Sequence, residues 1–263
     1  MKDPPHYARW VRKVHSMEDD IPVDVDLLAE KCGIPVHEDS IQGFLGLWLH
    51  VGDSEGIVLA EGQSPRRRRF TLAHELGHAC LPTHRKSAGL KCLEEDLAER
   101  DSGRGLETEA NSFAAELLAP RRLVTPLLRT GAVSIQKANE IAEQFDISLT
   151  CAVRRIVEYG KQPTAMVLSQ GGVVRWSVRR NGFPWGLPGS GRPIPAGTVA
   201  REIYVGREGS LTPKKIEKLT WLPEASARFT LMESSIQLGG LDQILALLWI
   251  PDLEGAGSGE DDD

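Results

Sequence analysis

Two histidines, four residues apart in an apolar stretch, restrict the fold of this sequence more than any other feature. Residues 70–80 read FTLAHELGHAC, in which His74 and His78 form an HExxH motif. On an α-helix, four residues rise about 6 Å and turn through about 400°, so both imidazoles leave the same face. This spacing lets two ring nitrogens reach one Zn²⁺-sized ion at about 2.0–2.1 Å. The motif therefore predicts a helix over residues 70–80 that carries two metal ligands.

Glu75, between the two histidines, is the candidate catalytic base. It is rotated by about 100° from His74, so its carboxylate lies beside a bound metal rather than on it. There it can take a proton from a metal-bound water, whose pKa the metal lowers to about 7. The alternative is two surface histidines at this spacing by chance. The apolar neighbours favour burial, and buried polar groups need partners, which favours the catalytic interpretation.

His84 is one of two candidates for the third protein ligand that a catalytic site of this kind needs. It lies six residues after His78, the spacing of the longer motif HExxHxxGxxH. The glycine at which that motif turns is replaced here by Leu81, with Pro82 after it. This replacement favours a loop histidine in solvent.

Glu107 is the preferred third ligand. Residues 106–119 predict a second helix, on which Glu107 and Asn111 share a face. Small residues on that face would let this helix lie close to the HExxH helix, and Asn111 would then hydrogen-bond a ligand histidine. Glu109 and Glu116 are expected to point towards solvent.

Several other segments have a readable pattern. Residues 22–33 predict a short helix that ends at a glycine, and residues 44–62 predict a β-hairpin. Residues 82–105 predict a short helix with leucines at 90, 93 and 97, followed by a loop. The basic run 66–69 lies just before the predicted HExxH helix. It could hold an acidic substrate or nucleic acid, but a solvated face is the preferred interpretation.

Residues 134–155 resemble a helix-turn-helix in pattern. Phe145 would pack the first helix, Ser148 would cap the second, and Arg154 and Arg155 would follow. One interpretation is DNA binding through the second helix in the major groove. The preferred one is a helical hairpin that closes the peptidase domain or receives the substrate, because the local net positive charge is modest.

The pattern changes near residue 162, which predicts a domain boundary. Strand-like runs occupy residues 165–169, 173–178, 202–206 and 227–232, and an apolar segment covers 241–250. The tryptophans of this region are expected in its core. We predict an α+β protein with a zinc-peptidase-like domain at 1–120, a helix-turn-helix-like block at 121–161, an α/β domain at 162–253 and a disordered acidic tail at 254–263.

The segments FTLAHELGH and ETEANSFAAELLAP closely resemble the ImmA/IrrE family of bacterial metallopeptidases. The resemblance covers residues 20–160 and continues more weakly to about residue 250. It implies a gluzincin-like fold, with Glu107 as third ligand through the family's E-x-x-A-N pattern, and Zn²⁺ or Mn²⁺ as a single bound ion. It further implies a helix-turn-helix repressor as substrate and a GAF-like C-terminal domain that senses a small molecule or stress signal.

Charge and cysteine content bound the remaining possibilities. The formal net charge is −6, which argues against nucleic-acid binding by the whole chain. The four cysteines form no CxxC pair, as is typical of a reducing compartment. The N-terminus has no signal-peptide pattern, and no stretch approaches the roughly 18 apolar residues that span a bilayer. We expect a cytoplasmic protein with no membrane partner.

The expected function is a metal-dependent endopeptidase that cleaves a helix-turn-helix repressor. The resemblance implies that this cleavage induces a response to DNA damage, radiation and desiccation. The alternative is a DNA-binding regulator that acts through residues 134–156 and has a structural metal site. Glu75 separates the two, because a structural site has no need of a carboxylate next to a metal-bound water.

Overall fold

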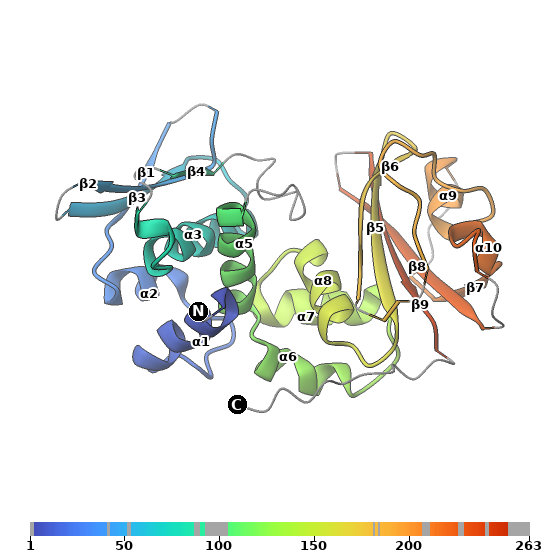
Figure 1. Ribbon diagram of the computed structural model, residues 1–263, viewed down its shortest axis with the longest axis horizontal. Coiled ribbons are helices and arrows are strands. Elements are labelled where there is room, and N and C mark those ends of the chain that lie inside the picture. Colours follow the sequence, from blue (N-terminus) through green and yellow to red (C-terminus); the bar gives the residue numbers. More distant parts are fainter. Residues whose placement is uncertain are drawn as a thin grey trace. The chain divides into compact units, whose positions relative to one another are not determined.

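The computed structural model describes residues 3–40, 43–51, 54–86, 90–92, 105–180, 182–183, 185–206, 211–225, 229–239 and 242–251 (Figure 1). Its mixture of helices and sheets confirms the α+β class. The chain forms two compact units, one of residues 1–123 and 143–148, the other of residues 124–142 and 149–263. The boundaries expected near residues 120 and 162 stay a prediction, and the expected acidic tail lies outside the described residues. No helix in the described part of the chain is long and apolar enough to span a bilayer.

In its described residues, the first unit combines a sheet with several helices. Its elements are α1 (Pro4–Val14), α2 (Val25–Lys31), β1 (Val36–Asp39), β2 (Gly46–Val51), β3 (Ser54–Ala60), α3 (Pro65–Cys80), the 3₁₀ helix η1 (His84–Lys86), β4 (Leu90–Cys92) and α5 (Gly105–Leu118). Figure 1 shows the sheet on one side of α3 and α5 beside that helix.

The four-stranded sheet has the order β1-β3-β2-β4. The predicted hairpin is confirmed, since β2 and β3 pair antiparallel with Trp48 opposite Ile57. Both of these side chains are fully buried, so alternate residues of the hairpin face the helices. Strand β4 pairs with β2 where part of a short helix was predicted. That prediction is wrong for residues 90–92, and its remaining leucines lie outside the described residues.

Two buried charged side chains join α1 to the end of α5. The Arg12 guanidinium is 1% exposed and donates to the backbone carbonyl of Leu117 at 2.7 Å. Glu116 is completely buried and accepts hydrogen bonds from Arg9 Nη1 and the Arg121 amide, both at 3.1 Å. The expectation that Glu116 faces solvent is wrong, because α1 covers that side of α5.

The chain crosses between the units within α6 (Arg121–Leu128), within α7 (Ile135–Phe145) and before α8 (Leu149–Tyr159). The two helices predicted within residues 134–155 are present as α7 and α8. Ser134 begins α7 by accepting a hydrogen bond from the Lys137 amide at 3.1 Å. Arg154 and Arg155 both form ion pairs with Glu158, and the side chain of Arg155 is only 3% exposed.

The second unit contains α8 and an antiparallel sheet of order β6-β5-β9-β8-β7. Its further elements are β5 (Thr164–Gln170), β6 (Val173–Arg179), α9 (Val199–Tyr204), β7 (Lys214–Ile216), α10 (Lys218–Trp221), β8 (Leu231–Leu238) and β9 (Gln243–Trp249). Helix α8 packs against β5 and β6, whereas α9 packs against β8 and β9. Buried residues of β5 alternate between the two faces, so the core lies on both sides of the sheet.

Helix α9 replaces the strand predicted at residues 202–206. Thr198 caps the helix by accepting from the Arg201 amide at 3.0 Å. Val199 and Ile203 are buried in the core cluster of this unit. The β-branched residues of this segment misled the prediction, because tertiary burial on one helical face outweighs their intrinsic preference for strands.

Candidate metal centre

Helix α3 positions the HExxH residues, and it begins earlier than predicted. Ser64 stands at the N-cap and Pro65 at the first helical position, where a proline is favourable. Residues 66–69 therefore belong to the first turns of the helix rather than to the preceding loop. From Thr71 to Ala79 every residue is buried.

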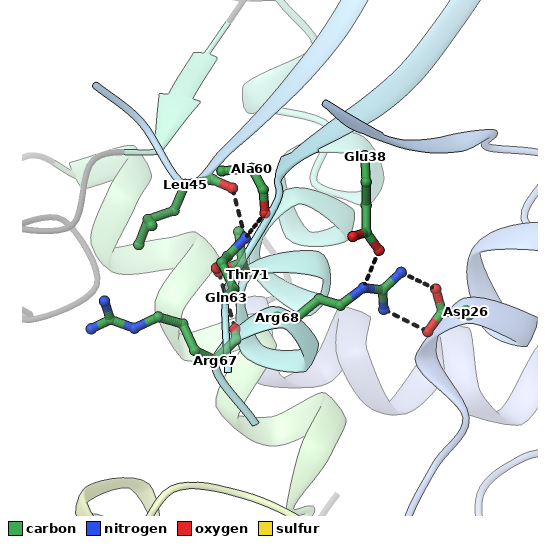
Figure 2. Close-up of polar contacts among 8 residues, drawn as sticks. All are labelled: Asp26, Glu38, Leu45, Ala60, Gln63, Arg67, Arg68 and Thr71. Carbon is green, nitrogen blue, oxygen red and sulfur yellow. Dashed lines mark hydrogen bonds and ion pairs between the residues drawn. The ribbon is translucent and has the colours of Figure 1, made fainter. Parts of the chain in front are cut away.

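The first turns of α3 are tied to neighbouring elements by polar contacts (Figure 2). The Arg68 guanidinium donates to both carboxylate oxygens of Asp26 at 2.8 and 2.9 Å and to Glu38 at 2.6 Å. These bonds outweigh partial burial and raise the pKa of Arg68. Thr71 Oγ1 lies 2.8 Å from Gln63 Oε1, and Gln63 Nε2 donates to the carbonyl of Leu45 at 3.0 Å. The helix is thus fixed against α2, β1 and the residue before β2.

Two further arginines of the basic run pair with acidic residues at the C-terminal end of α7 and just after it. Arg66 forms ion pairs with Glu143 at 3.0 Å and Asp146 at 3.1 Å. Arg69 lies 3.1 Å from Asp146, a residue with a positive φ of 49°. Three of the four arginines, Arg66, Arg68 and Arg69, therefore form ion pairs within the first unit. The solvated basic face expected from the sequence is only partly present. Each exposed pair stabilises by about 0.2–1 kcal/mol.

A glycine allows α3 and α5 to approach closely. A methyl group at Gly77 would lie 3.2 Å from Ala110 Cα and 3.2 Å from Phe113 Cδ1. Such contacts are tighter than ordinary van der Waals packing. The close approach brings Glu107 and Asn111 of α5 next to His74 of α3.

Three predicted ligands lie together. His74 Nε2 is 3.0 Å from His78 Nε2 and 3.1 Å from Glu107 Oε2, and His78 Nε2 is 3.5 Å from Glu107 Oε2. Two ligands at about 2.0–2.1 Å from a tetrahedral ion are about 3.3 Å apart, so one ion fits this triangle. Among the described residues, this is the one group of three side chains with metal-ligand geometry. Two imidazoles and a carboxylate suit Zn²⁺ and Mn²⁺.

The electrostatics of the site favour an ionised Glu107 and a neutral His78 at neutral pH. Burial would raise the pKa of Glu107, but close contacts with the imidazoles of His74 and His78 outweigh it and lower this pKa to about 2. Burial lowers the pKa of His78 to about 4, against the opposing effect of Glu107. Metal ligands must be deprotonated. Glu107 and His78 are therefore already in the protonation state that suits metal binding in the metal-free protein.

Asn111 lies as expected beside the first histidine. Its side chain is buried, and its Oδ1 is 3.1 Å from His74 Nδ1. A carbonyl oxygen only accepts, so His74 Nδ1 carries the proton and Nε2 presents its lone pair. This leaves the nitrogen that faces the ligand triangle free to bind a metal.

Glu75 lies in the interior, and no hydrogen bond of normal distance and angle reaches either carboxylate oxygen from the described residues. Burial first, and the charge of Glu107 second, raise the pKa of Glu75 well above its usual value, against a smaller opposing effect of the Trp48 backbone N–H. A methyl group at Gly46 would lie 2.7 Å from Glu75 Oε1, so β2 passes directly against this carboxylate. A glycine within a strand is the sequence signal for such an approach. Gly46 was nevertheless not among the predicted site residues.

His84 does not belong to the ligand triangle, and it is not a solvent-exposed loop residue either. It is completely buried, with Nδ1 at 2.8 Å from His78 Nδ1 and Nε2 at 3.1 Å from Glu109 Oε2. Glu109 is about one third exposed and faces His84. The expectation that His84 lies in solvent is wrong, because η1 folds back against the end of α3. Glu109 is partly exposed as expected, but it also contacts His84.

Comparisons with known proteins find similarity over much of the first unit and the start of the second. The family model described as the IrrE N-terminal-like domain, a peptidase domain, matches residues 29–157. The radiation response metalloprotease IrrE of Deinococcus deserti is 35% identical over 112 residues, which are 41% of this chain and 38% of that protein. The radiation response metalloprotease IrrE of Deinococcus radiodurans is 30% identical over 111 residues, 41% of this chain and 32% of that protein. The matched segment thus spans less than two fifths of these curated relatives.

A solved structure resembles a larger part of the fold. A Mycobacterium tuberculosis transcriptional regulator superposes with a TM-score of 0.56 at 11% identity, over 93% of this chain and 75% of that chain. At this identity the likeness concerns the fold alone. It extends the similarity beyond the segment that the curated relatives match.

Proposed function

Residues 29–157 belong to the IrrE N-terminal-like peptidase family, and we propose that the protein is a metal-dependent endopeptidase. The single observation that carries this proposal is Glu75, a buried carboxylate without a hydrogen-bond partner among the described residues, next to three converging ligand atoms. A structural metal site would gain nothing from such a group, which costs folding free energy.

In the proposed mechanism, His74, His78 and Glu107 hold one Zn²⁺ or Mn²⁺ ion. The ion, when bound, supplies Lewis acidity that polarises a peptide carbonyl and makes water more acidic. Glu75 takes a proton from the attacking water on a free carboxylate oxygen and passes it to the leaving amine. Its raised pKa in the metal-free protein suits a group that must both accept and release a proton. Asn111 holds the His74 ring in the orientation for binding.

The proposed substrate is a helix-turn-helix repressor whose cleavage induces a response to DNA damage, radiation and desiccation. The names of the Deinococcus relatives support the radiation response. The mycobacterial protein of similar fold is named as a transcriptional regulator, which supports a role in transcription. We further propose that α7 and α8 form a helix-turn-helix-like surface that receives the repressor. The antiparallel sheet of the second unit would be a GAF-like sensor of a small molecule or stress signal.

The rival function is direct DNA binding by residues 134–156. Its second helix offers little free positive charge, since Arg154 and Arg155 both pair with Glu158. Several free phosphate-binding cations are needed for a tight grip on DNA. This observation favours the peptidase.

The decisive experiment replaces Glu75 by Gln. Cleavage of a candidate repressor should fall by about 10²–10⁴-fold, the usual effect of losing an acid/base group. Metal content, measured by elemental analysis, should stay near that of the wild type. Chelator should abolish cleavage by the wild type, and cleavage by the variant at the wild-type rate would disprove the mechanism.

The ligand set has its own test. Glu107→Ala should lose or loosen the metal and inactivate the protein, because it removes one corner of the triangle. Asn111→Ala should lower metal affinity or activity by about 10-fold or more, as is typical of groups that orient a ligand histidine. Isothermal titration with Zn²⁺ and with Mn²⁺ measures both, and normal metal affinity in Glu107→Ala would remove it from the ligand set.

A further inference from the structure

We propose that His84 and Glu109 form a hydrogen-bonded relay that orients His78 for metal binding and fixes which of its nitrogens carries the proton. The inference rests on the proposed metal site. It assigns positioning roles to two residues outside the ligand triangle, from a 3₁₀ helix and from α5.

Burial and contact geometry supply the first argument. The side chains of His78 and His84 are both fully buried, and a buried imidazole needs partners for both ring nitrogens. His84 meets this need with His78 Nδ1 at 2.8 Å and Glu109 Oε2 at 3.1 Å. His78 has its other nitrogen, Nε2, on the ligand triangle. The contact with His84 is thus on the edge of the ring that faces away from the ion site.

The direction of the hydrogen bonds supplies the second argument. An ionised carboxylate only accepts, so the nitrogen of His84 that faces Glu109 carries a proton. A neutral His84 then has a bare Nδ1, which can only accept. The contact at 2.8 Å therefore requires that His78 Nδ1 donates. This leaves His78 Nε2 without a proton, which is the form that binds a metal.

Glu109 is itself held in place. Thr83 Oγ1 donates to Glu109 Oε2 at 3.3 Å, so the carboxylate oxygen that faces His84 has a second partner. Glu109 lies two residues after Glu107 on α5. Helix α5 thus supplies the Glu107 carboxylate to the ion site and the Glu109 carboxylate to His84, on the side of His84 that faces away from His78. Asn111 has the same effect on His74 that His84 has on His78, because its Oδ1 accepts from Nδ1 and so keeps the proton on that nitrogen.

Three variants of the full chain test the relay. Glu109→Ala removes the acceptor for His84, and His84→Leu removes the acceptor for His78 Nδ1. His84→Gln keeps a side-chain carbonyl that can accept from His78 Nδ1. The first two should lower Zn²⁺ affinity by about 10–100-fold, measured by competition with a chromophoric chelator. His84→Gln should recover part of the loss. His37→Leu, a change at an exposed position on β1, is the matched control and should bind Zn²⁺ like the wild type.

A spectroscopic measurement separates positioning from simple structural support. In the metal-free wild type, ¹⁵N NMR of His78 should show the proton on Nδ1. In Glu109→Ala the two nitrogens should approach a mixture of both tautomers. Co²⁺ bound to the variant should also show a changed visible absorption spectrum. Since Glu109 is partly exposed, this variant can be checked for an unchanged fold by circular dichroism even if His84→Leu does not fold.

The outcomes distinguish the relay from the proposed function. Normal Zn²⁺ affinity and an unchanged tautomer in Glu109→Ala would overturn the relay while the wild-type metal site stands. A proton on His78 Nε2 in the metal-free wild type would also overturn it. A wild type that binds neither Zn²⁺ nor Mn²⁺ would remove the proposed function itself, and the relay with it.

Discussion

At the scale of single residues, Glu75 and Glu107 form a pair of carboxylates with opposite electrostatic environments. Burial and the charge of Glu107 raise the pKa of Glu75, whereas contacts with the two histidines outweigh burial and lower the pKa of Glu107 to about 2. The ionised form of Glu75 is therefore unfavourable in the folded metal-free protein, and that of Glu107 is favourable. The first carboxylate suits proton transfer and the second suits metal ligation.

This contrast predicts opposite effects on stability. A raised folded-state pKa costs stability above the unfolded value of 4.5, and the cost disappears below it. Glu75→Gln should therefore stabilise the metal-free protein at pH 7, with no gain at pH 4. A lowered folded-state pKa contributes stability above 4.5 that is lost as the pH falls through about 2. Glu107→Gln should therefore destabilise at pH 7.

Urea unfolding of the metal-free wild type and both variants, at pH 7 and pH 4, measures these effects. Circular dichroism at each pH provides the control that the folded baseline is unchanged. A Glu75→Gln variant less stable than the wild type at pH 7 would contradict the environment assigned to Glu75.

At the scale of secondary-structure elements, the contact between α3 and α5 determines the site. Gly77→Ala should force the two helices apart, because its methyl group would meet the backbone of Ala110 at 3.2 Å. Overpacking of this kind typically costs about 1–3 kcal/mol, and the shift should also lower metal affinity. Gly105→Ala, at the start of α5, is the matched control, because no atom of the described residues lies within 4 Å of a methyl group added there. Thermal unfolding and Zn²⁺ titration measure both, and equal behaviour of the two variants would contradict the role of this contact.

The helices around the motif could be predicted from sequence because their signals are local. Periodic apolar residues predict the HExxH helix and α5, and the spacing of His74 and His78 brings them to one face. The start of α3 at Pro65 was not predicted, because the four arginines that follow it show no apolar periodicity. Helix α9 was missed because its burial depends on a sheet distant in the sequence.

Partners of site residues could be predicted only in part. Glu107 and Asn111 share a helical face, so their joint arrival at the site follows from one element. The contacts of His84 with Glu109, and of Gly46 with Glu75, depend on how separate elements pack. No periodicity within one element contains that information.

At the scale of the whole molecule, the division into units affects any truncation. A fragment of residues 1–160 contains all three metal ligands and should bind Zn²⁺. It also contains α8 without the strands that cover it, although Val153, Ile156 and Val157 are buried in the full chain. The fragment should therefore bind a hydrophobic dye such as ANS and self-associate, whereas the full chain should not.

Zn²⁺ titration, dye fluorescence and size-exclusion chromatography of both proteins check this prediction. Substituting Ser for Val153 and for Val157 in the fragment should reduce its self-association without a change in metal affinity. A fragment that folds but binds no metal would show that the site needs residues beyond 160.

The path of the chain between the two units has a consequence for how such proteins diversify. Residues 143–148 belong to the first unit, although residues 124–142 before them belong to the second. The chain therefore passes between the two units three times. A single genetic crossover anywhere from residue 124 to 148 would combine incomplete parts of both units. Recombination can exchange the C-terminal half intact only if the segment 124–148 stays compatible with both parents. We therefore expect the two halves to be inherited together, because chimaeras joined within this segment should fold poorly.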